Sequence, residues 1–309
     1  MWANGIEDDD VHTNMKTSTS SLKCIGGVVA FTLAMSLLLY AENKIPDECK
    51  VGGFAIGCIV YTFDRFSLYE ALEKTAECGG TVVELSAKTS LSKEEPNVPF
   101  DYHASAETIQ KVKAKLAQCK LKAASYAVIP FPAEEAEGRK LFEFAKAMGL
   151  RAITTESPEL IDRLEKFVKQ YDIMIAFHDH PRRPNDASYR MWDPNYVLSL
   201  VKDRDPRIGV CADTGHWIRS GLKPVECLRI LKGHVVTSHL KDLNEMGLRA
   251  HDVPYGTGVA DMPGILEELK AQGFEGNLSV EYEYHWDNSA PEVGQCIGFV
   301  RGYGAARKW

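Results

Sequence analysis

The chain has 309 residues, of which 45% are hydrophobic and 26% charged, as in a globular protein with one large or two small domains. Its formal net charge is −7 at pH 7, its pI is about 5.8, and the sequence contains no basic cluster. Proteins that bind nucleic-acid phosphates carry a basic surface, so we expect no nucleic-acid partner.

The first 41 residues differ from the rest of the chain. Cys24 to Ala41 contain no charge and are mostly apolar, with Lys16 and Lys23 before them and small-residue cleavage possible after Leu39-Tyr40-Ala41. This pattern predicts a secretory signal peptide, which fits best if translation starts at Met15. The alternative is an uncleaved membrane anchor, because about 18 apolar residues approach the minimum for spanning a bilayer. We therefore expect an exported protein, periplasmic or extracellular, or one held to the membrane by this segment alone.

After a polar linker at residues 42–52, strand and helix patterns alternate to the end of the chain. Apolar, partly β-branched runs predict eight strands: Phe54–Tyr61, Thr81–Leu85, Leu121–Ile129, Leu150–Thr155, Ile173–Phe177, a run from Ile208 to Asp213, Val235–Leu240 and Asn277–Tyr282. Helical periodicity and capping residues predict Ser67–Cys78, Ser105–Lys120, Ala133–Met148, Ser157–Gln170, a helix from Asp193, Pro224–Lys232, Pro263–Gln272 and a weaker Pro291–Arg301.

Eight strand–helix units in about 250 residues favour a closed barrel over an open sheet. We therefore predict an α/β fold, a single (β/α)8 TIM barrel over residues 53–309. No G-x-G-x-x-G follows the first strand and no P-loop lysine motif occurs, so dinucleotide and nucleotide binding lack their usual motifs.

Four successive strands end in polar residues: His178-Asp179-His180, Asp213-Thr214-Gly215-His216, His239-Leu240-Lys241-Asp242 and Glu281-Tyr282-Glu283. In a barrel, the C-terminal ends of the strands carry the active residues. Strand parity places Asp213, His239 and Glu281, with Glu156 after the fourth strand, on inward faces. Carboxylate and imidazole ligands suit one divalent ion, Mn²⁺, Mg²⁺, Co²⁺ or Zn²⁺.

Each of these residues also has a purely structural interpretation. A single strand-end acid is more often a helix N-cap or the partner of a lysine, and Glu156 stands directly before a predicted helix start. His216 is equally well a turn histidine, His178 or His180 can satisfy backbone groups, and Glu84 is expected to be a structural acid. The repetition at four strand ends favours a metal site.

Several segments resemble the sugar phosphate isomerase/epimerase family of the xylose isomerase-like TIM barrel superfamily. They are YTFDRFSLYEALEKTAECGGTVVEL (61–85), FEFAKAMGLRAITTE (142–156), IAFHDHP (175–181), VCADTGHW (210–217), SHLKD (238–242), VPYGTG (253–258) and SVEYE (279–283). The resemblance implies one divalent metal held by Glu156, Asp213, His239 and Glu281. His178 stands where ketose 3-epimerases have their first acid, as in the inosose dehydratase-like branch.

The resemblance and the strand-end residues predict an isomerase or epimerase that transfers a proton alpha to the carbonyl of a sugar or polyol. Glu281 and Glu156 are the candidate proton carriers, Lys241 would stabilise negative charge on oxygen, and His178 would act beside them. Substrate contacts are expected from His180, His216 and Trp217, although loop packing explains the aromatic residue equally well.

Three other functions remain open from the sequence. The same residues can expel a β-leaving group, which would make the protein a lyase, a dehydratase or an enzyme that cleaves keto-glycosides. A barrel that only binds sugar is a second alternative, and an apurinic endonuclease is a third, disfavoured by the acidic composition. A small carbohydrate is the expected partner, and a homo-oligomer is possible.

Overall fold

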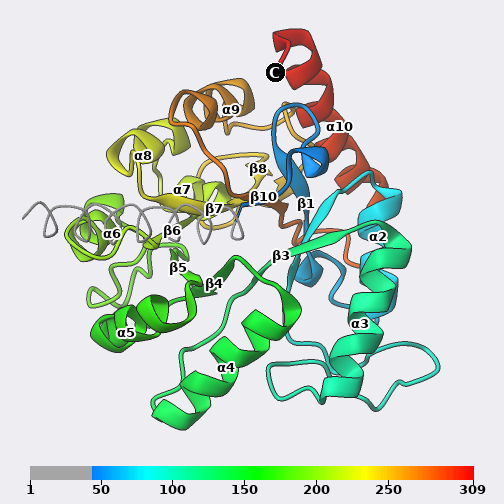
Figure 1. Cartoon of the computed structure of the whole chain (residues 1–309). Coiled ribbons are helices and arrows are strands. Elements are labelled where there is room, and N and C mark those ends of the chain that lie inside the picture. Colours follow the sequence, from blue (N-terminus) through cyan, green and yellow to red (C-terminus); the bar gives the residue numbers. More distant parts are fainter. Residues whose placement is uncertain (1–43) are drawn as a thin grey trace, which may run out of the picture. The chain divides into compact units, whose positions relative to one another are not determined.

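The structure, a computed structural model, describes residues 44–309, so the segment 1–41 predicted as signal or anchor lies outside the described residues. Eight parallel strands close into a barrel in the order β1-β10-β7-β6-β5-β4-β3-β2, and the helices surround it (Figure 1). The strands are β1 Ala55–Ile59, β2 Val82–Leu85, β3 Lys122–Tyr126, β4 Ala152–Thr155, β5 Met174–His178, β6 Ile208–Asp213, β7 Val235–Leu240 and β10 Asn277–Val280. The predicted (β/α)8 barrel is confirmed.

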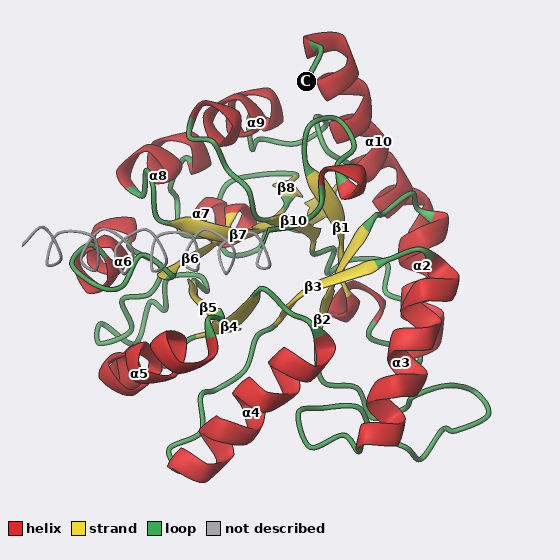
Figure 2. Ribbon diagram, in the orientation of Figure 1, coloured by secondary structure: helices red, strands yellow, loops and turns green. Residues whose placement is uncertain are grey.

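The helices between the strands are drawn red in Figure 2. They are α2 Leu68–Glu77, α3 Ala106–Cys119, α4 Glu135–Met148, α5 Ile161–Tyr171, α6 Pro194–Val201, α7 Thr214–Arg219, α8 Pro224–Ile230, α9 Met262–Ala271 and α10 Ala290–Arg307, with 3-10 turns η1 Asp47–Cys49, η2 Val60–Phe63 and η3 Pro158–Leu160. In residues 44–309, no helix is both long and apolar enough to cross a membrane.

Local sequence explains where the helices begin. Ser67 and Glu70 form a capping box at the start of α2, in which each side chain bonds the backbone of the other residue. Asp193 caps α6 by accepting from the N–H of Asn195, and Pro194 follows at the first helical position. These residues fix where the loops after β1 and β5 end, at the edge of the barrel formed by the C-terminal ends of the strands.

The barrel interior is apolar at one end and polar at the other. Small buried residues of the first strands, Ala55, Val82 and Ala124, pack with Ile45, which the preceding linker supplies. A polar contact also lies at this level: Asn277, the first residue of β10, pairs in register with Ala55 and donates to Ser125 Oγ at 3.0 Å. Buried polar groups of this kind require partners, and the barrel supplies them across its interior.

Two elements and one helix end differ from the predictions. The short helix α7 follows β6 without a loop, and a two-stranded antiparallel sheet, β8 Asp242–Leu243 with β9 Asp252–Val253, lies in the long loop after β7. The last helix, α10, continues to Arg307, six residues beyond the predicted end at Arg301.

Candidate metal centre

Two histidines turn one ring nitrogen each into the polar end of the barrel. His178, the last residue of β5, places Nδ1 2.9 Å from Glu156 Oε1 and Nε2 3.1 Å from His239 Nδ1. His239, near the end of β7, uses its other nitrogen, Nε2, to contact Glu84 Oε2 at 3.0 Å. Each ring is therefore tied to a carboxylate by one nitrogen, which leaves the second nitrogen as a ligand.

Asp213, the last residue of β6, divides its carboxylate between two tasks. Its Oδ1 accepts the N–H of His216 at 2.8 Å and so caps α7, as the structural interpretation of a strand-end acid predicts. Its Oδ2 is buried and accepts no hydrogen bond. Burial opposes the charge on this carboxyl, but His216 and Lys241 hold its pKa well below the usual value. Asp213 is thus both a cap and an available anion.

Glu281, directly after β10, presents a second buried carboxylate oxygen without a hydrogen bond, Oε2. This atom lies 3.1 Å from His239 Nδ1. Burial raises the pKa of Glu281, but the positive charge of Lys241 and the ring of His239 outweigh it, so the pKa falls below its usual value. Glu281 is therefore ionised at neutral pH.

Lys241, directly after β7, is a fully buried ammonium beside three carboxylates. Its Nζ lies 3.1 Å from Asp213 Oδ2, 2.8 Å from Glu281 Oε2 and 2.8 Å from Glu283 Oε2. Burial would lower the pKa of Lys241, but these carboxylates raise it well above the usual value. The ammonium compensates the charges of Asp213 and Glu281 through ion pairs to their buried oxygens.

The donor atoms suit one divalent cation. His178 Nε2 lies 3.6 Å from Asp213 Oδ2, and His239 Nδ1 lies 3.9 Å from the same oxygen. Ligand atoms that share a first-row ion at about 2.1 Å lie about 3.0–3.4 Å apart, so these separations are close to those of a coordination shell. His178, Asp213, His216 and Glu281 also form a group whose ligand atoms all lie within 4.8 Å of one another. The residues fit a divalent ion with nitrogen and oxygen ligands.

Glu156 belongs to a different group, with His178 and His180. Its Oε1 contacts the Nδ1 atoms of both histidines, and Tyr189 donates to its Oε2 at 3.3 Å. Burial raises the pKa of Glu156, but the two imidazoles outweigh this effect and lower it to about 2. Within residues 44–309, no hydrogen bond joins Glu156 to Asp213 or Glu281. Its assignment as a metal ligand stays a prediction.

A cavity of about 500 Å³ opens over this group. Its lining includes Tyr61, Glu156, His178, His180, Glu281 and Glu283. His216 is buried at 4% exposure beside Asp213, with its ring stacked on His180 at 4.8 Å. Trp217 is 1% exposed and packs in the main hydrophobic core, away from this lining. The structure therefore supports packing for Trp217, and its predicted substrate contact stays untested.

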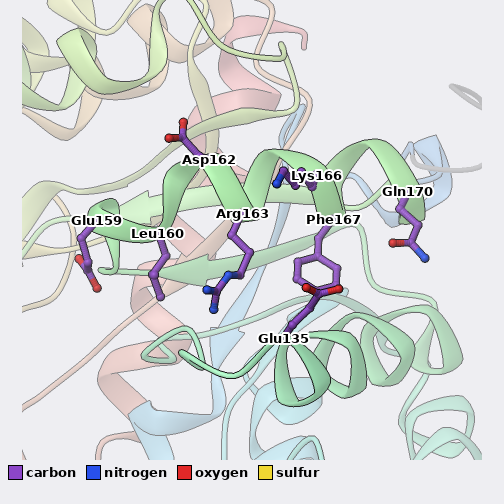
Figure 3. A pocket seen from close by; sticks show the side chains of 8 residues that line it. All are labelled: Glu135, Glu159, Leu160, Asp162, Arg163, Lys166, Phe167 and Gln170. Carbon is purple, nitrogen blue, oxygen red and sulfur yellow. The ribbon is translucent and has the colours of Figure 1, made fainter.

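A separate hollow lies between α4 and α5, lined by the side chains drawn in Figure 3. Arg163 of α5 reaches across it to the carbonyl of Ala133. None of its lining residues belongs to the cavity at the strand ends. We therefore place the candidate site at the strand ends alone.

Sequence reasoning missed a group of charged residues that holds Lys241. Arg219 of α7 donates to Glu283 Oε2 at 2.9 Å and to Asp252 Oδ2 at 3.4 Å. Glu283 has the same strand parity as Glu281, which was an available signal. Arg219 and Asp252 had none, because they lie in α7 and β9, the elements that the sequence did not predict.

Comparisons with known proteins agree with the barrel. Residues 72–302 match the xylose isomerase-like TIM barrel family. The chain is 29% identical over 174 residues to the rhizopine catabolism protein MocC of Rhizobium meliloti, and the match spans 51% of this chain and only 45% of that protein.

Two solved structures extend this likeness over most of the chain. An uncharacterized protein from Parabacteroides distasonis is 28% identical, with a TM-score of 0.65, over 81% of this chain and 98% of that one. A D-tagatose 3-epimerase-like protein is 17% identical, with a TM-score of 0.63, over 83% of this chain and 100% of that one, which shows a shared fold. Since the family match spans more than half of the sequence, the chain belongs to the xylose isomerase-like TIM barrel family.

Proposed function

We propose that the protein is a divalent-metal-dependent isomerase or epimerase that transfers a proton at the carbon next to the carbonyl of a sugar or polyol. The observation that carries the proposal is the pair His178 and His239. Each ring has one nitrogen on a carboxylate and the other 3.1 Å from its partner ring, beside the buried oxygens Asp213 Oδ2 and Glu281 Oε2. The similarity to a D-tagatose 3-epimerase-like protein supports the class of reaction.

The ligands in this proposal are His178, Asp213, His239 and Glu281, which come from β5, β6, β7 and the residue after β10. This set differs from the one predicted from the sequence by His178 in place of Glu156. A divalent ion bound by these four residues supplies Lewis-acid polarisation of a substrate carbonyl and an adjacent hydroxyl. Glu84 contacts the other ring nitrogen of His239 and so orients the ring. The carboxylate of Glu84 is itself held in place, because it accepts hydrogen bonds from Thr154 and Ser279.

Glu156 is then the carboxylate that moves the proton. It lines the cavity, and its side chain is 18% exposed, against 8% for Glu281. His178, His180 and Tyr189 fix both of its oxygens, so it is ionised and oriented before substrate arrives. It takes the proton from carbon as the bond's electron pair moves to the carbonyl oxygen. Return of the proton by Glu156 to the neighbouring carbon gives an isomer. Delivery of a proton to the opposite face by Glu281, the second candidate proton carrier, gives an epimer.

Lys241 and the histidines assist this step. Lys241 places a permanent positive charge beside Glu281, where it stabilises charge that develops on oxygen. Glu283 pairs with the ammonium and is itself held by Arg219. His180, whose side chain is 45% exposed, is free to donate to a substrate hydroxyl from the cavity wall.

Two glutamate variants test these separate roles. Glu281→Gln removes a ligand charge, and we expect it to lose both metal binding and turnover. Glu156→Gln should retain the metal, measured by calorimetric titration with Mn²⁺, while turnover falls by about 10²–10⁴-fold, the range of a general base. Glu159→Gln, an exposed acid of η3, is the matched control. Full turnover in Glu156→Gln would reject its role in proton transfer.

Proton NMR in D₂O with ketoses, inososes and 3-keto-glycosides distinguishes the reaction classes. Deuterium that enters at carbon without elimination supports the isomerase or epimerase. Loss of a β-leaving group would instead identify a lyase, since the same residues can expel that group once the proton is removed. A protein that binds the metal and sugar but exchanges no proton would be a sugar-binding barrel.

A further inference from the structure

A second hollow adjoins the cavity at the strand ends. Its volume is about 610 Å³, and its lining comes from residues 180–186 of the loop after β5, with Leu248 and Glu156. Glu156 and His180 line both spaces. The second hollow therefore lies next to the cavity at the proposed metal ligands, and the proposed reaction does not use it.

Two consecutive arginines dominate the lining. The guanidinium of Arg182 lies 5.2 Å from the ring centroid of Trp192, and that of Arg183 lies 3.8 Å from the ring centroid of Tyr189. Stacking on an aromatic face leaves the N–H donors in the guanidinium plane available. Such a fork matches the geometry of carboxylate and phosphate oxygens.

These arginines are poorly neutralised. Arg183 has a long contact to Asp186, 3.7 Å from Nη1 to Oδ2, with its own side chain 54% exposed. Arg182 has no carboxylate within ion-pair distance in the part of the chain that the structure describes. Most other arginines of this acidic chain are paired, as are Arg204 and Arg207. The two charges therefore remain available to a ligand.

The loop that carries them is fastened to the candidate site. The Tyr189 hydroxyl accepts the N–H of His180 at 2.9 Å and donates to Glu156 Oε2. The N–H of Arg182 donates to Ser220 Oγ at 2.9 Å, which ties the loop to the end of α7. The ring beneath Arg183 thus also orients the proposed proton carrier, which places the two arginines beside the candidate site.

We propose that this hollow is an anion subsite, in which Arg182 and Arg183 bind an acidic group on the part of the substrate that projects from the metal ligands. The inference rests on the proposed function and narrows it to acidic sugars or their glycosides. Carboxylate and phosphate groups share the required chemistry. The predicted export of the chain favours a carboxylate, because sugar phosphates are scarce outside the cytoplasm.

Equilibrium binding to the full chain tests the subsite without turnover. The probes are D-glucuronate, D-glucose 6-phosphate and neutral D-glucose, titrated in Mn²⁺ at low ionic strength. We expect at least one acidic sugar to bind about tenfold or more tightly than glucose, the effect of one charge-assisted hydrogen bond. Arg182→Gln and Arg183→Gln should each lose most of that preference while glucose binding stays unchanged. Whether D-glucuronate or D-glucose 6-phosphate binds more tightly then shows whether the subsite prefers a carboxylate or a phosphate.

Arg190→Gln is the matched control. Arg190 lies on the same loop and stacks on Tyr196 at 4.2 Å, but it does not line the hollow. The subsite is rejected if neither acidic sugar is preferred over glucose, or if Arg190→Gln weakens acidic sugars as much as Arg182→Gln does. Preference for an acidic sugar without deuterium exchange on any substrate would reject the proposed function and retain the subsite. Deuterium exchange on neutral ketoses without a preference for acidic sugars would retain the proposed function and reject the subsite.

Discussion

Lys241 is the residue on which the charges of the site depend. Its ammonium is buried among Asp213, Glu281 and Glu283, and removal of one member of a buried ion pair leaves an uncompensated charge. We expect Lys241→Met to lower the free energy of unfolding of the metal-free protein by about 3–5 kcal/mol. Urea denaturation in the presence of a chelator measures this loss.

Metal addition separates this explanation from a simple packing defect. A divalent ion would restore positive charge beside Asp213 and Glu281, so Mn²⁺ should raise the melting temperature of Lys241→Met more than that of the wild type. Equal increases would mean that Lys241 does not share its counter-charge role with the ion. Lys223→Met, on the exposed turn before α8, is a suitable control.

Asp252 gives stability a distinct pH dependence. Burial raises the pKa of this carboxyl to about 7, although Lys241 and Arg219 oppose the rise. Between the unfolded value near 4 and the folded value near 7, the folded state binds a proton that the unfolded state has lost. Stability contributed by this group is therefore complete below pH 4 and falls as pH rises to 7, by about 1.4 kcal/mol per unit.

Asp252→Asn should remove that slope, because the amide stays neutral at every pH. Compared by urea denaturation, the variant should gain stability relative to the wild type between pH 4 and pH 7. A constant difference across this range would show that the carboxyl titrates normally in the folded protein.

At the scale of elements, β6 depends on a glycine for its close contact with the neighbouring strand, β7. A Cβ at Gly209 would lie 2.2 Å from the carbonyl oxygen of His234 and 2.7 Å from Val236 Cγ2. We expect Gly209→Ala to push β6 away from β7 and cost about 1–3 kcal/mol, measured by thermal denaturation. Since β6 carries Asp213 and β7 carries His239, metal affinity should fall as well.

A helical glycine provides the opposite expectation. Gly298 of α10 is exposed, and no atom lies within 4 Å of the position that an added methyl group would take. Gly298→Ala should therefore stabilise the protein by roughly 1 kcal/mol through helix propensity, measured by the same thermal denaturation. If both alanine variants destabilised the protein equally, the strand contact at Gly209 would not be the cause of its loss.

The sequence predicted helices and strands correctly where the local residue pattern and the tertiary structure favour the same element. The eight strands are apolar runs between glycine, proline and capping residues, and all eight form. Helix α7 was not predicted because it has only six residues, too few to show a helical repeat of apolar residues. It also directly follows β6, so no loop in the sequence separates it from the strand. The extension of α10 through Gly302 and Gly304 was missed for a tertiary reason: Gly304 packs against the backbone of Gly52, a contact that only glycine permits.

In the molecule as a whole, the sequence predicted which strand ends meet, but not which of their side chains face the candidate metal centre. Strand parity brought Asp213, His239 and Glu281 to one place, and the structure places them together. Parity cannot distinguish Glu156 from His178, because both lie at strand ends and contact each other. Side-chain rotation decides which of them turns toward Asp213. Trp217 illustrates the same limit, since one turn of α7 directs it into the core.

The position of the donors predicts how a metal affects the whole barrel. His178, Asp213, His239 and Glu281 come from the ends of four neighbouring strands, β5, β6, β7 and β10, so one ion would join all four. Binding to the folded state alone stabilises it by about 4 kcal/mol at a metal concentration a thousand times the Kd. For a barrel of this size each kcal/mol raises the melting temperature by about 2–4 °C.

We therefore expect Mn²⁺ to raise the melting temperature of chelator-treated protein by about 8–16 °C, as measured by differential scanning calorimetry. Asp213→Asn should lose most of this increase because it removes the charge of Oδ2 while its Oδ1 still caps α7. Glu107→Gln, an acid on the exposed face of α3, should keep the full increase. An increase that survives in Asp213→Asn would place the ion elsewhere on the molecule. Lys241 would then be the group that neutralises the buried carboxylates at the strand ends.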